Sequence, residues 1–171
     1  MSDVIWPLEI ENYKMRLLRQ ADADVVQTLL DACQDYFMLC EGEPGMAQAL
    51  FMACPPQKSH DEDKVVLGLF HQDQVIGMID LIRDYPEDGT WTIGYLLIHS
   101  NYRNLGLGQK WVRQMATILK DLGAQKLRCV VQQQNPRALH FWQQLGFAVQ
   151  ASQRQDLGTI INQVDVLEIS F

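Results

Sequence analysis

The segment from residue 95 to residue 108 reads YLLIHSNYRNLGLG. An apolar run typical of a strand leads into a short loop, and Gly106 and Gly108 stand where an amphipathic helix begins. Glycine lets the backbone turn sharply and approach a ligand closely. The first N–H groups of a helix lack internal partners and point toward an anion. The segment therefore indicates a phosphate-binding turn. A glycine-containing turn that leads into a helix without binding a ligand has the same sequence pattern and is the alternative.

Two common nucleotide motifs do not match this segment. It lacks the G-K-[ST] ending of a P-loop, and it lacks the third glycine and the downstream acid of a dinucleotide fingerprint. Arg103 adds a positive charge of the kind that binds phosphate. Residues 103–137 carry seven basic side chains and one acidic side chain. This basic patch suits a small polyanion, and solvated helix and strand faces are the alternative explanation.

The pattern on either side of the segment predicts one mixed α/β domain. Three apolar runs in succession break the strict alternation of strands and helices that a doubly wound sheet requires. Leu107, Trp111, Met115, Ile118 and Leu122 recur at helical spacing. Asn135-Pro136 is typical of a helix start, with an N-cap residue followed by proline. The expected strands cover 13–18, 65–70, 75–82, 91–98, 126–132, 147–151 and 160–171, and the expected helices cover 23–37, 46–53, 107–122 and 136–145.

Composition excludes several other classes of protein. At 171 residues, with 47% apolar and 20% charged residues, the chain is sized and composed as one globular domain. A net charge of −7 argues against non-specific nucleic-acid binding, which needs basic residues. No apolar run is long enough to span a bilayer, and the N-terminus has no signal-peptide pattern. The four cysteines have no zinc-ligand spacing, so we expect no metal and a reduced, cytoplasmic location.

Two motifs together resemble the GNAT superfamily of acyl-CoA-dependent N-acetyltransferases. The first is an R-x-x-G-x-G signature after a strand, formed here by Arg103, Gly106 and Gly108. The second is an Asn-x-x-Ala start of a helix that ends in Leu-Gly-Phe, here Asn135, Ala138 and residues 145–147. The resemblance implies a single domain over 1–171 with a mostly antiparallel central sheet flanked by helices. It places the motif-bearing core at about 65–150 and implies acetyl-CoA as co-substrate.

The resemblance also implies which residues bind acetyl-CoA. The backbone of the strand end would pair with the pantetheine amides as an added strand would. The N–H groups of the following loop would bind the pyrophosphate, and the helix-capping asparagine would contact the pantetheine arm. The residues carried over are Leu97, Ile98, Arg103, Asn104, Leu105, Gly106, Leu107, Gly108, Gln109, Asn135 and Trp142.

Trp142 departs from the family pattern, which often has a tyrosine there to protonate the departing thiolate. An indole is a hydrogen-bond donor without useful acidity, so Trp142 cannot act as a general acid. Two roles stay open for it: a core aromatic on the helix stripe, or a wall against the thioester end of the cofactor. Because a thiol has a pKa near ~8.5, it can leave without full protonation, and catalysis is not excluded.

An amine must lose a proton before it attacks a thioester, and the sequence offers several candidate bases. Asp80, His99 and His140 are candidates near the expected cleft. In the family the first two helices form part of the acceptor site, so Asp35, Glu41 and Glu43 could bind a cationic acceptor instead.

The sequence therefore leaves three functions open. The first is an N-acetyltransferase that moves an acetyl group to a primary amine of a small molecule or protein, by direct attack in a ternary complex. The second is a related module that binds acyl-CoA without catalysis. The third is an α/β interaction domain with a coincidental glycine turn. In the first two cases we expect no nucleic-acid or membrane partner. The sequence does not decide between a monomer and a homodimer.

Overall fold

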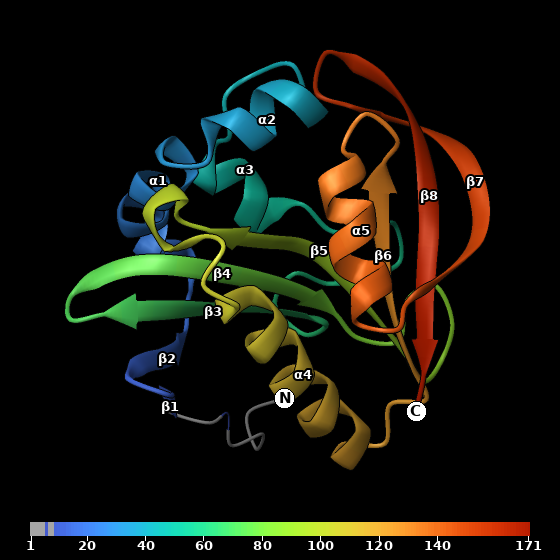
Figure 1. Ribbon diagram of the computed structural model, residues 1–171, viewed down its shortest axis with the longest axis horizontal. Coiled ribbons are helices and arrows are strands. Elements are labelled where there is room, and N and C mark those ends of the chain that lie inside the picture. The colour runs from blue at the N-terminus through green and yellow to red at the C-terminus, as the bar shows by residue number, and fades with distance from the viewer. Residues whose placement is uncertain (1–5, 7–8) are drawn as a thin grey trace.

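The computed structural model describes Trp6 and residues 9–171. One eight-stranded sheet has the order β1-β2-β3-β4-β5-β6-β8-β7. Neighbouring strands pair antiparallel, except that β5 and β6 run parallel. The expected mixed, mostly antiparallel sheet flanked by helices is confirmed (Figure 1). The strands are β1 Glu9–Ile10, β2 Tyr13–Leu17, β3 Lys64–His71, β4 Gln74–Ile82, β5 Thr90–Ile98, β6 Lys126–Gln132, β7 Ala148–Leu157 and β8 Ile160–Ser170.

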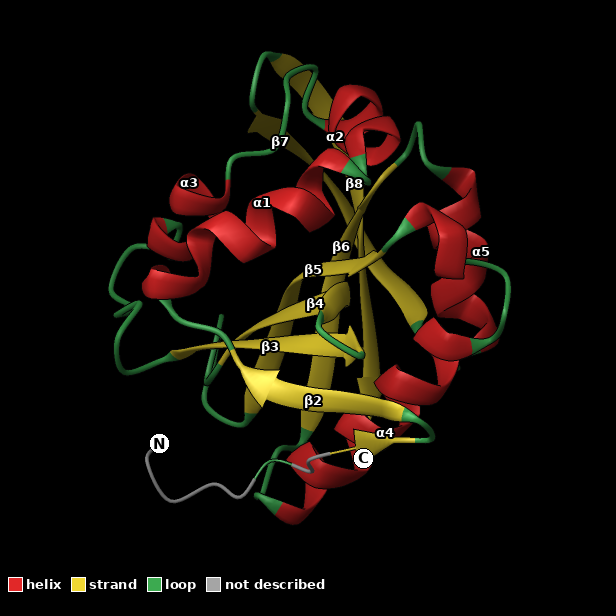
Figure 2. Cartoon of the chain, turned by 90° about the vertical axis from the view of Figure 1, so that its left-hand side faces the viewer, coloured by secondary structure: helices red, strands yellow, loops and turns green. Residues whose placement is uncertain are grey.

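The helices cover the two faces of the sheet and create two apolar cores. Helices α1 to α3 pack on one face, and α4 and α5 pack on the other (Figure 2). Trp111 and Met115 of α4 centre one core, and Leu29 and Phe37 of α1 and α2 centre the other. None of the described helices is long and apolar enough to cross a membrane. The helices are α1 Ala23–Asp31, α2 Gln34–Cys40, α3 Ala47–Met52, α4 Leu107–Asp121 and α5 Pro136–Gln144, with 3-10 turns η1 Gln20–Asp22 and η2 Ser100–Tyr102.

The single helix expected over 23–37 is wrong, because the structure has two helices there. The chain leaves α-helical geometry at Ala32 and Cys33, where the Cys33 N–H donates to the carbonyl of Leu30 at 3.0 Å. Cys33 nevertheless stays buried in the same core as Leu30 and Phe37. The apolar spacing therefore continues through the break, and hydrophobic periodicity alone does not reveal it.

The expected end of the strand at Ala151 is also wrong, because β7 continues to Leu157. This strand lies at the edge of the sheet, and most of its residues are exposed. An exposed edge strand has no buried face, so its polar sequence carries no hydrophobic alternation. Backbone pairing with β8 holds it, through register partners that run from Ala148–Glu168 to Leu157–Ile160.

A buried ion pair lies between β3 and β4. The Lys64 ammonium is 3.0 Å from the Asp80 carboxylate, and both side chains are at most 5% exposed. Lys64 also donates to the carbonyls of Leu50 and Ala53 at 2.7 Å each. Burial raises the pKa of Asp80 to about 6, against the attraction of Lys64. Lys64 thus joins the end of α3 to the sheet, and it is the only charged partner of Asp80 among the described residues.

We expect Lys64→Met to lower the free energy of unfolding by about 3–5 kcal/mol at pH 7, because it leaves the Asp80 charge buried and unpaired. Urea denaturation measures this change. The wild-type Asp80 pKa lies above its ordinary 3.8, so its contribution to stability falls as pH rises from about 4 to about 6. Because Lys64 lowers the pKa of Asp80, the carboxyl of Lys64→Met takes up its proton at a higher pH than in the wild type. The deficit of Lys64→Met should therefore shrink between pH 7 and pH 5.

The double variant Lys64→Met with Asp80→Leu is the matched control. It removes both charges and keeps apolar volume, so it should recover most of the lost stability. An equal deficit in the single and the double variant would show that the ion pair is not what Lys64 contributes.

Candidate functional site

Strands β5 and β6 separate beyond the first half of β5. Their parallel pairing joins Thr90–Ile93 to Lys126–Cys129 and stops there. Farther along, β5 pairs with β4 up to Ile98, and β6 pairs with β8 up to Gln132. The β6-facing edge of β5 therefore has no strand partner after Ile93 among the described strands. A cavity of about 550 Å³ lies between the two strands where they separate.

The cavity brings together most of the residues that the sequence predicts for cofactor binding. Helix α2 contributes part of the wall through Asp35, Tyr36 and Leu39. Leu105 does not line the cavity, and its side chain is 64% exposed. The predicted residues that line it are Leu97, Ile98, Arg103, Asn104, Gly106, Leu107, Gly108, Gln109, Asn135 and Trp142.

The N-terminus of α4 opens onto this cavity. Gly106 is the N-cap residue, in the left-handed conformation with φ +78°, and no described side chain caps the helix there. Asn104 is also left-handed, with φ +62°, a conformation that asparagine tolerates better than most residues. A Cβ atom on Gly106 would meet no described heavy atom within 4 Å. The free helix end therefore faces open space, and its N–H groups can bind an anion there.

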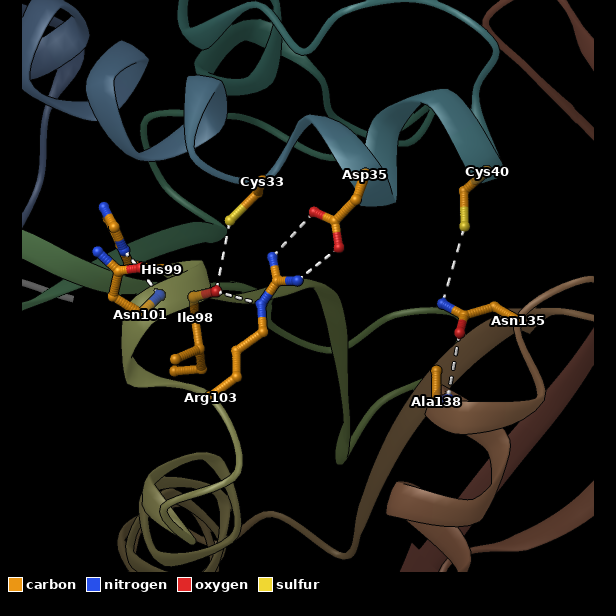
Figure 3. A network of polar contacts seen from close by, with 9 residues as sticks. All are labelled: Cys33, Asp35, Cys40, Ile98, His99, Asn101, Arg103, Asn135 and Ala138. Atoms are coloured by element: carbon orange, nitrogen blue, oxygen red, sulfur yellow. Dashed lines mark hydrogen bonds and ion pairs between the residues drawn. The ribbon is translucent and has the colours of Figure 1, made fainter.

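The Arg103 side chain joins the end of β5 to helix α2 (Figure 3). Its Nε donates to the carbonyl of Ile98 at 2.8 Å, and its two terminal nitrogens donate to the Asp35 carboxylate at 2.5 and 3.1 Å. Asp35 raises the pKa of Arg103, and Arg103 lowers the pKa of Asp35. The thiol of Cys33 lies 3.5 Å from the same Ile98 oxygen. The guanidinium is therefore held at the cavity wall by protein groups.

Asn135 and Trp142 bring helix α5 to the opposite wall. The Asn135 Oδ1 accepts a hydrogen bond from the N–H of Ala138 at 3.3 Å and caps the helix, and its Nδ2 lies 3.8 Å from the sulfur of Cys40. Trp142 is 6% exposed and packs edge-on against Phe141 and Phe147. Because Trp142 also lines the cavity, it is at once a core side chain and part of the wall.

A β-bulge at Gly94 changes which side of the sheet the rest of β5 faces. The register with β4 shifts between Asp80 and Leu81, so Gly94 is an extra residue on β5. Ile93 belongs to the core beneath α4 and α5, whereas Tyr95, two residues on, packs with the core beneath α1 to α3. Regular alternation would put both on one face. The bulge thus turns the Tyr95 phenol toward α2, where it donates a 2.5 Å hydrogen bond to the Glu41 carboxylate.

Sequence reasoning did not single out Tyr95 or Tyr36 as site residues. Both line the cavity, and their rings meet edge-on with centroids 6.1 Å apart. A tyrosine within an apolar strand or helix stripe indicates a core position, and the bulge leaves no mark in the sequence except Gly94 itself. Gly94 itself is the one sequence signal for the bulge, because a glycine inside a strand often marks one.

The three candidate bases lie in different surroundings. Asp80 is buried beside Lys64 and does not line the cavity. His99 is half-buried, and its Nδ1 accepts a hydrogen bond from the N–H of Asn101 at 3.2 Å. His140 lines the cavity and is exposed on α5. Within Trp6 and residues 9–171, no three His, Cys, Asp or Glu side chains are grouped so that they could hold a metal ion. The catalytic role of each of the three bases remains a prediction.

Several solved structures with this fold are acetyltransferases by name. An acetyltransferase from Thermus thermophilus has a TM-score of 0.73 and 22% identity, over 94% of this chain and 97% of that one. The ribosomal-protein-S18-alanine N-acetyltransferase from Escherichia coli has a TM-score of 0.71 and 13% identity, over 92% and 93%. The PaiA N-acetyltransferase from Thermoplasma acidophilum, solved in complex with coenzyme A, has a TM-score of 0.64 and 17% identity, over 93% and 99%.

The solved structures share the fold at low identity, and no curated protein sequence matches the chain. The sequence model of the acetyltransferase (GNAT) family, however, matches residues 26–147. That range runs from α1 to the residue after Gly146 and includes the Arg103 loop, the bulge and both signature helices. The chain therefore belongs to the GNAT family of acetyltransferases.

Proposed function

We propose that this protein transfers an acetyl group from acetyl-CoA to a primary amine of a small molecule or protein. The observation that carries the proposal is the meeting of two features at one cavity. A strand edge without a described partner lies beside the uncapped N-terminus of α4. The first can pair with amide groups, and the second can bind a pyrophosphate, which are the two recognition groups of coenzyme A.

The backbone groups around the cavity suit the amides and the pyrophosphate of acetyl-CoA. The backbone of Leu97 and Ile98 would pair with the pantetheine amides, as an added strand does. The N–H groups of residues 104–109 would hold the pyrophosphate at the start of α4. Arg103 would keep this loop against α2 through its contacts with the Ile98 carbonyl and the Asp35 carboxylate. We also propose a cytoplasmic location, with which the four free cysteines of the chain agree.

In the proposed reaction the amine nitrogen attacks the thioester carbonyl directly, with both substrates bound. A C–N bond forms, the C–S bond breaks, and the sulfur leaves as a thiolate. Trp142 supplies no proton, so the thiolate is released as such or takes a proton from solvent or from the amine nitrogen. Asp80, His99 and His140 are the bases that the sequence proposes for the amine proton.

The second candidate function is an acyl-CoA-binding module without catalysis. The indole of Trp142 at the position where the family often has a tyrosine favours it. Two measurements separate the candidates. Acetyl-CoA should raise the melting temperature in both cases, because a ligand that binds the folded state stabilises it. Thiol release from acetyl-CoA in the presence of a panel of primary amines occurs under the enzyme proposal alone.

The amine panel should contain polyamines, amino acids, aromatic amines and peptides with a free N-terminus, each at about pH 8 with saturating acetyl-CoA, where much of a weakly basic amine is neutral. We expect at least one amine to release free thiol at about ten or more times the rate without amine, with the acetylated amine detected by mass. Binding of acetyl-CoA without any amine-dependent product would refute the enzyme proposal and leave the binding module.

Gly106→Val should weaken acetyl-CoA binding at least tenfold, about 1.4 kcal/mol, in calorimetry. The new side chain would enter the open space in front of the α4 N-terminus, where the pyrophosphate is proposed to bind. Gly123→Val is the matched control at the other end of α4, since Gly123 also has a positive φ and open space around its Cβ position. It should cost similar stability and leave the affinity within about twofold, since it lies away from the proposed anion site. Equal affinities in the two variants would contradict the proposed site.

Trp142→Phe should keep most of the activity if the ring serves as a packed wall. Trp142→Ala should lower the free energy of unfolding by about 3–5 kcal/mol, because it leaves a cavity in the core. Urea denaturation and thiol release measure the two effects. A Trp142→Tyr variant that raised turnover more than about tenfold, with a new decline at high pH, would show that a side-chain acid limits this protein.

A further inference from the structure

We infer that Tyr95 and Glu41 form a proton-accepting pair: the Tyr95 phenol contacts the acceptor amine and passes its proton to the Glu41 carboxylate. The inference rests on the proposed acetyl transfer and names the base for it. It is carried by the hydrogen bond that joins a residue of the cavity wall to a carboxylate just outside it.

Glu41 is held firmly at the end of α2. Its N–H donates to the carbonyl of Phe37 at 2.7 Å, and its carbonyl accepts a 2.8 Å hydrogen bond from the N–H of Thr159 in the β7–β8 turn. A Cβ atom on Gly158 would lie 2.3 Å from the Glu41 carbonyl oxygen. The β7–β8 turn therefore packs so closely against Glu41 that a side chain at Gly158 would collide with its backbone. The Glu41 backbone is fixed from two sides, as a base that must stay in reach of its partner requires.

Tyr95 links this carboxylate to the cavity. Tyr95 lines the cavity and Glu41 does not, and the Tyr95 hydroxyl donates to the Glu41 Oε1 at 2.5 Å. The Gly94 bulge is what turns the phenol to this side. The phenolic oxygen still has lone pairs free to accept a hydrogen bond from an amine in the cavity. The Tyr36 ring meets the Tyr95 ring edge-on and adds a second aromatic side chain to the cavity wall beside the phenol. Aromatic rings attract a cation, so this wall suits a cationic amine.

The surroundings make Glu41 a stronger base than an exposed carboxylate. Burial raises the pKa of Glu41, the hydrogen bond from Tyr95 opposes this rise, and the nearby Glu43 adds to it. Burial and Glu41 raise the pKa of Tyr95, so the phenol stays protonated between transfers. The other titratable groups facing this pair are Tyr36, Cys40 and, from the neighbouring strand β4, Asp80, whose charge also raises the pKa of Tyr95. Burial raises the pKa of all three. No basic side chain among the described residues is paired with Glu41.

The proposed reaction has two stages, deprotonation of the amine and transfer of the acetyl group. An R–NH₃⁺ acceptor gives one proton to the Tyr95 oxygen while the phenolic proton moves to Glu41, leaving R–NH₂ and a protonated Glu41. The amine lone pair then forms the C–N bond, and the C–S electron pair leaves with sulfur. The second nitrogen proton goes to the thiolate, which gives the thiol and the amide. Glu41 returns its proton to solvent after the product leaves.

Glu41→Gln is the decisive variant, because glutamine can still accept the Tyr95 hydrogen bond but cannot take a proton. We expect kcat at pH 7 to fall by about 10²–10³-fold, in the range of general-base catalysis, for the fastest amine of the panel. The loss should shrink to less than about fivefold near pH 10, where a lysine-type amine with a pKa near ~10.4 is substantially neutral. Tyr95→Phe should show the same pH-dependent loss. Acetyl-CoA affinity and melting temperature should change little in Glu41→Gln.

Glu62→Gln is the matched control for charge. It removes the same charge from an exposed side chain in the loop before β3, which the cavity does not include. It should change KM for the amine by no more than about threefold and keep the wild-type pH profile, because an exposed charge is screened by solvent. Asp80→Asn, His99→Asn and His140→Asn test the other bases in the same assay. A pH-dependent loss in one of these three, with an unchanged profile in Glu41→Gln, would overturn the inference.

The outcomes separate this inference from the function on which it rests. If acetyl-CoA binds but no amine yields product, the proposed acetyl transfer fails, and the pair has no acceptor to deprotonate. If an amine reacts and Glu41→Gln loses activity equally at pH 7 and pH 10, Glu41 has a structural role and the inference alone is wrong. A loss at pH 7 that disappears at pH 10 in both Glu41→Gln and Tyr95→Phe supports the pair.

Discussion

Everything at the candidate site depends on the short parallel pairing of β5 with β6. The two strands share register partners over Thr90–Ile93 and Lys126–Cys129 and then follow different neighbours. Two strands that stay paired would bury their backbone groups against each other and leave no space for a ligand. Their separation instead exposes a strand edge, and it sets α2, α4 and α5 around one opening. The cavity is thus a property of strand partners rather than of any single residue.

The Gly94 bulge changes which of the two cores the side chains of β5 face along this opening. Up to Ile93 and again at Leu96 and Ile98, β5 faces the core beneath α4 and α5, where the uncapped helix end lies. At Tyr95 and Leu97 it faces the core beneath α1 to α3. One extra residue therefore lets the same strand keep a backbone edge without a described partner along the cavity and turn a phenol toward α2. The Arg103–Asp35 ion pair, whose two residues line the cavity, connects the loop after β5 to α2.

The sequence by itself determined the chain's family and the greater part of the fold. Helix α4, strand β6 and the Asn135-Pro136 start of α5 lie where the apolar spacing and the capping residues predict them. These elements follow from local rules: a helical or strand repeat, a cap, and a glycine after the last turn. Ten of the eleven residues predicted for the cofactor line one cavity, because they belong to two short motifs that each form a continuous wall. Leu105 is the exception, since the loop turns its side chain to solvent.

Tertiary structure decided how the side chains between α2 and β5 meet. The break at Ala32 and Cys33, the long edge strand β7 and the shift of register at Gly94 leave little trace in hydrophobic spacing, because each is set by packing or pairing with a distant part of the chain. Glu41 meets Tyr95 across 54 residues, and the β7–β8 turn fixes Glu41 from still farther along the sequence. A contact of this kind depends on where the folded backbone places two side chains. No spacing in the sequence encodes it, and the tertiary structure is needed to find it.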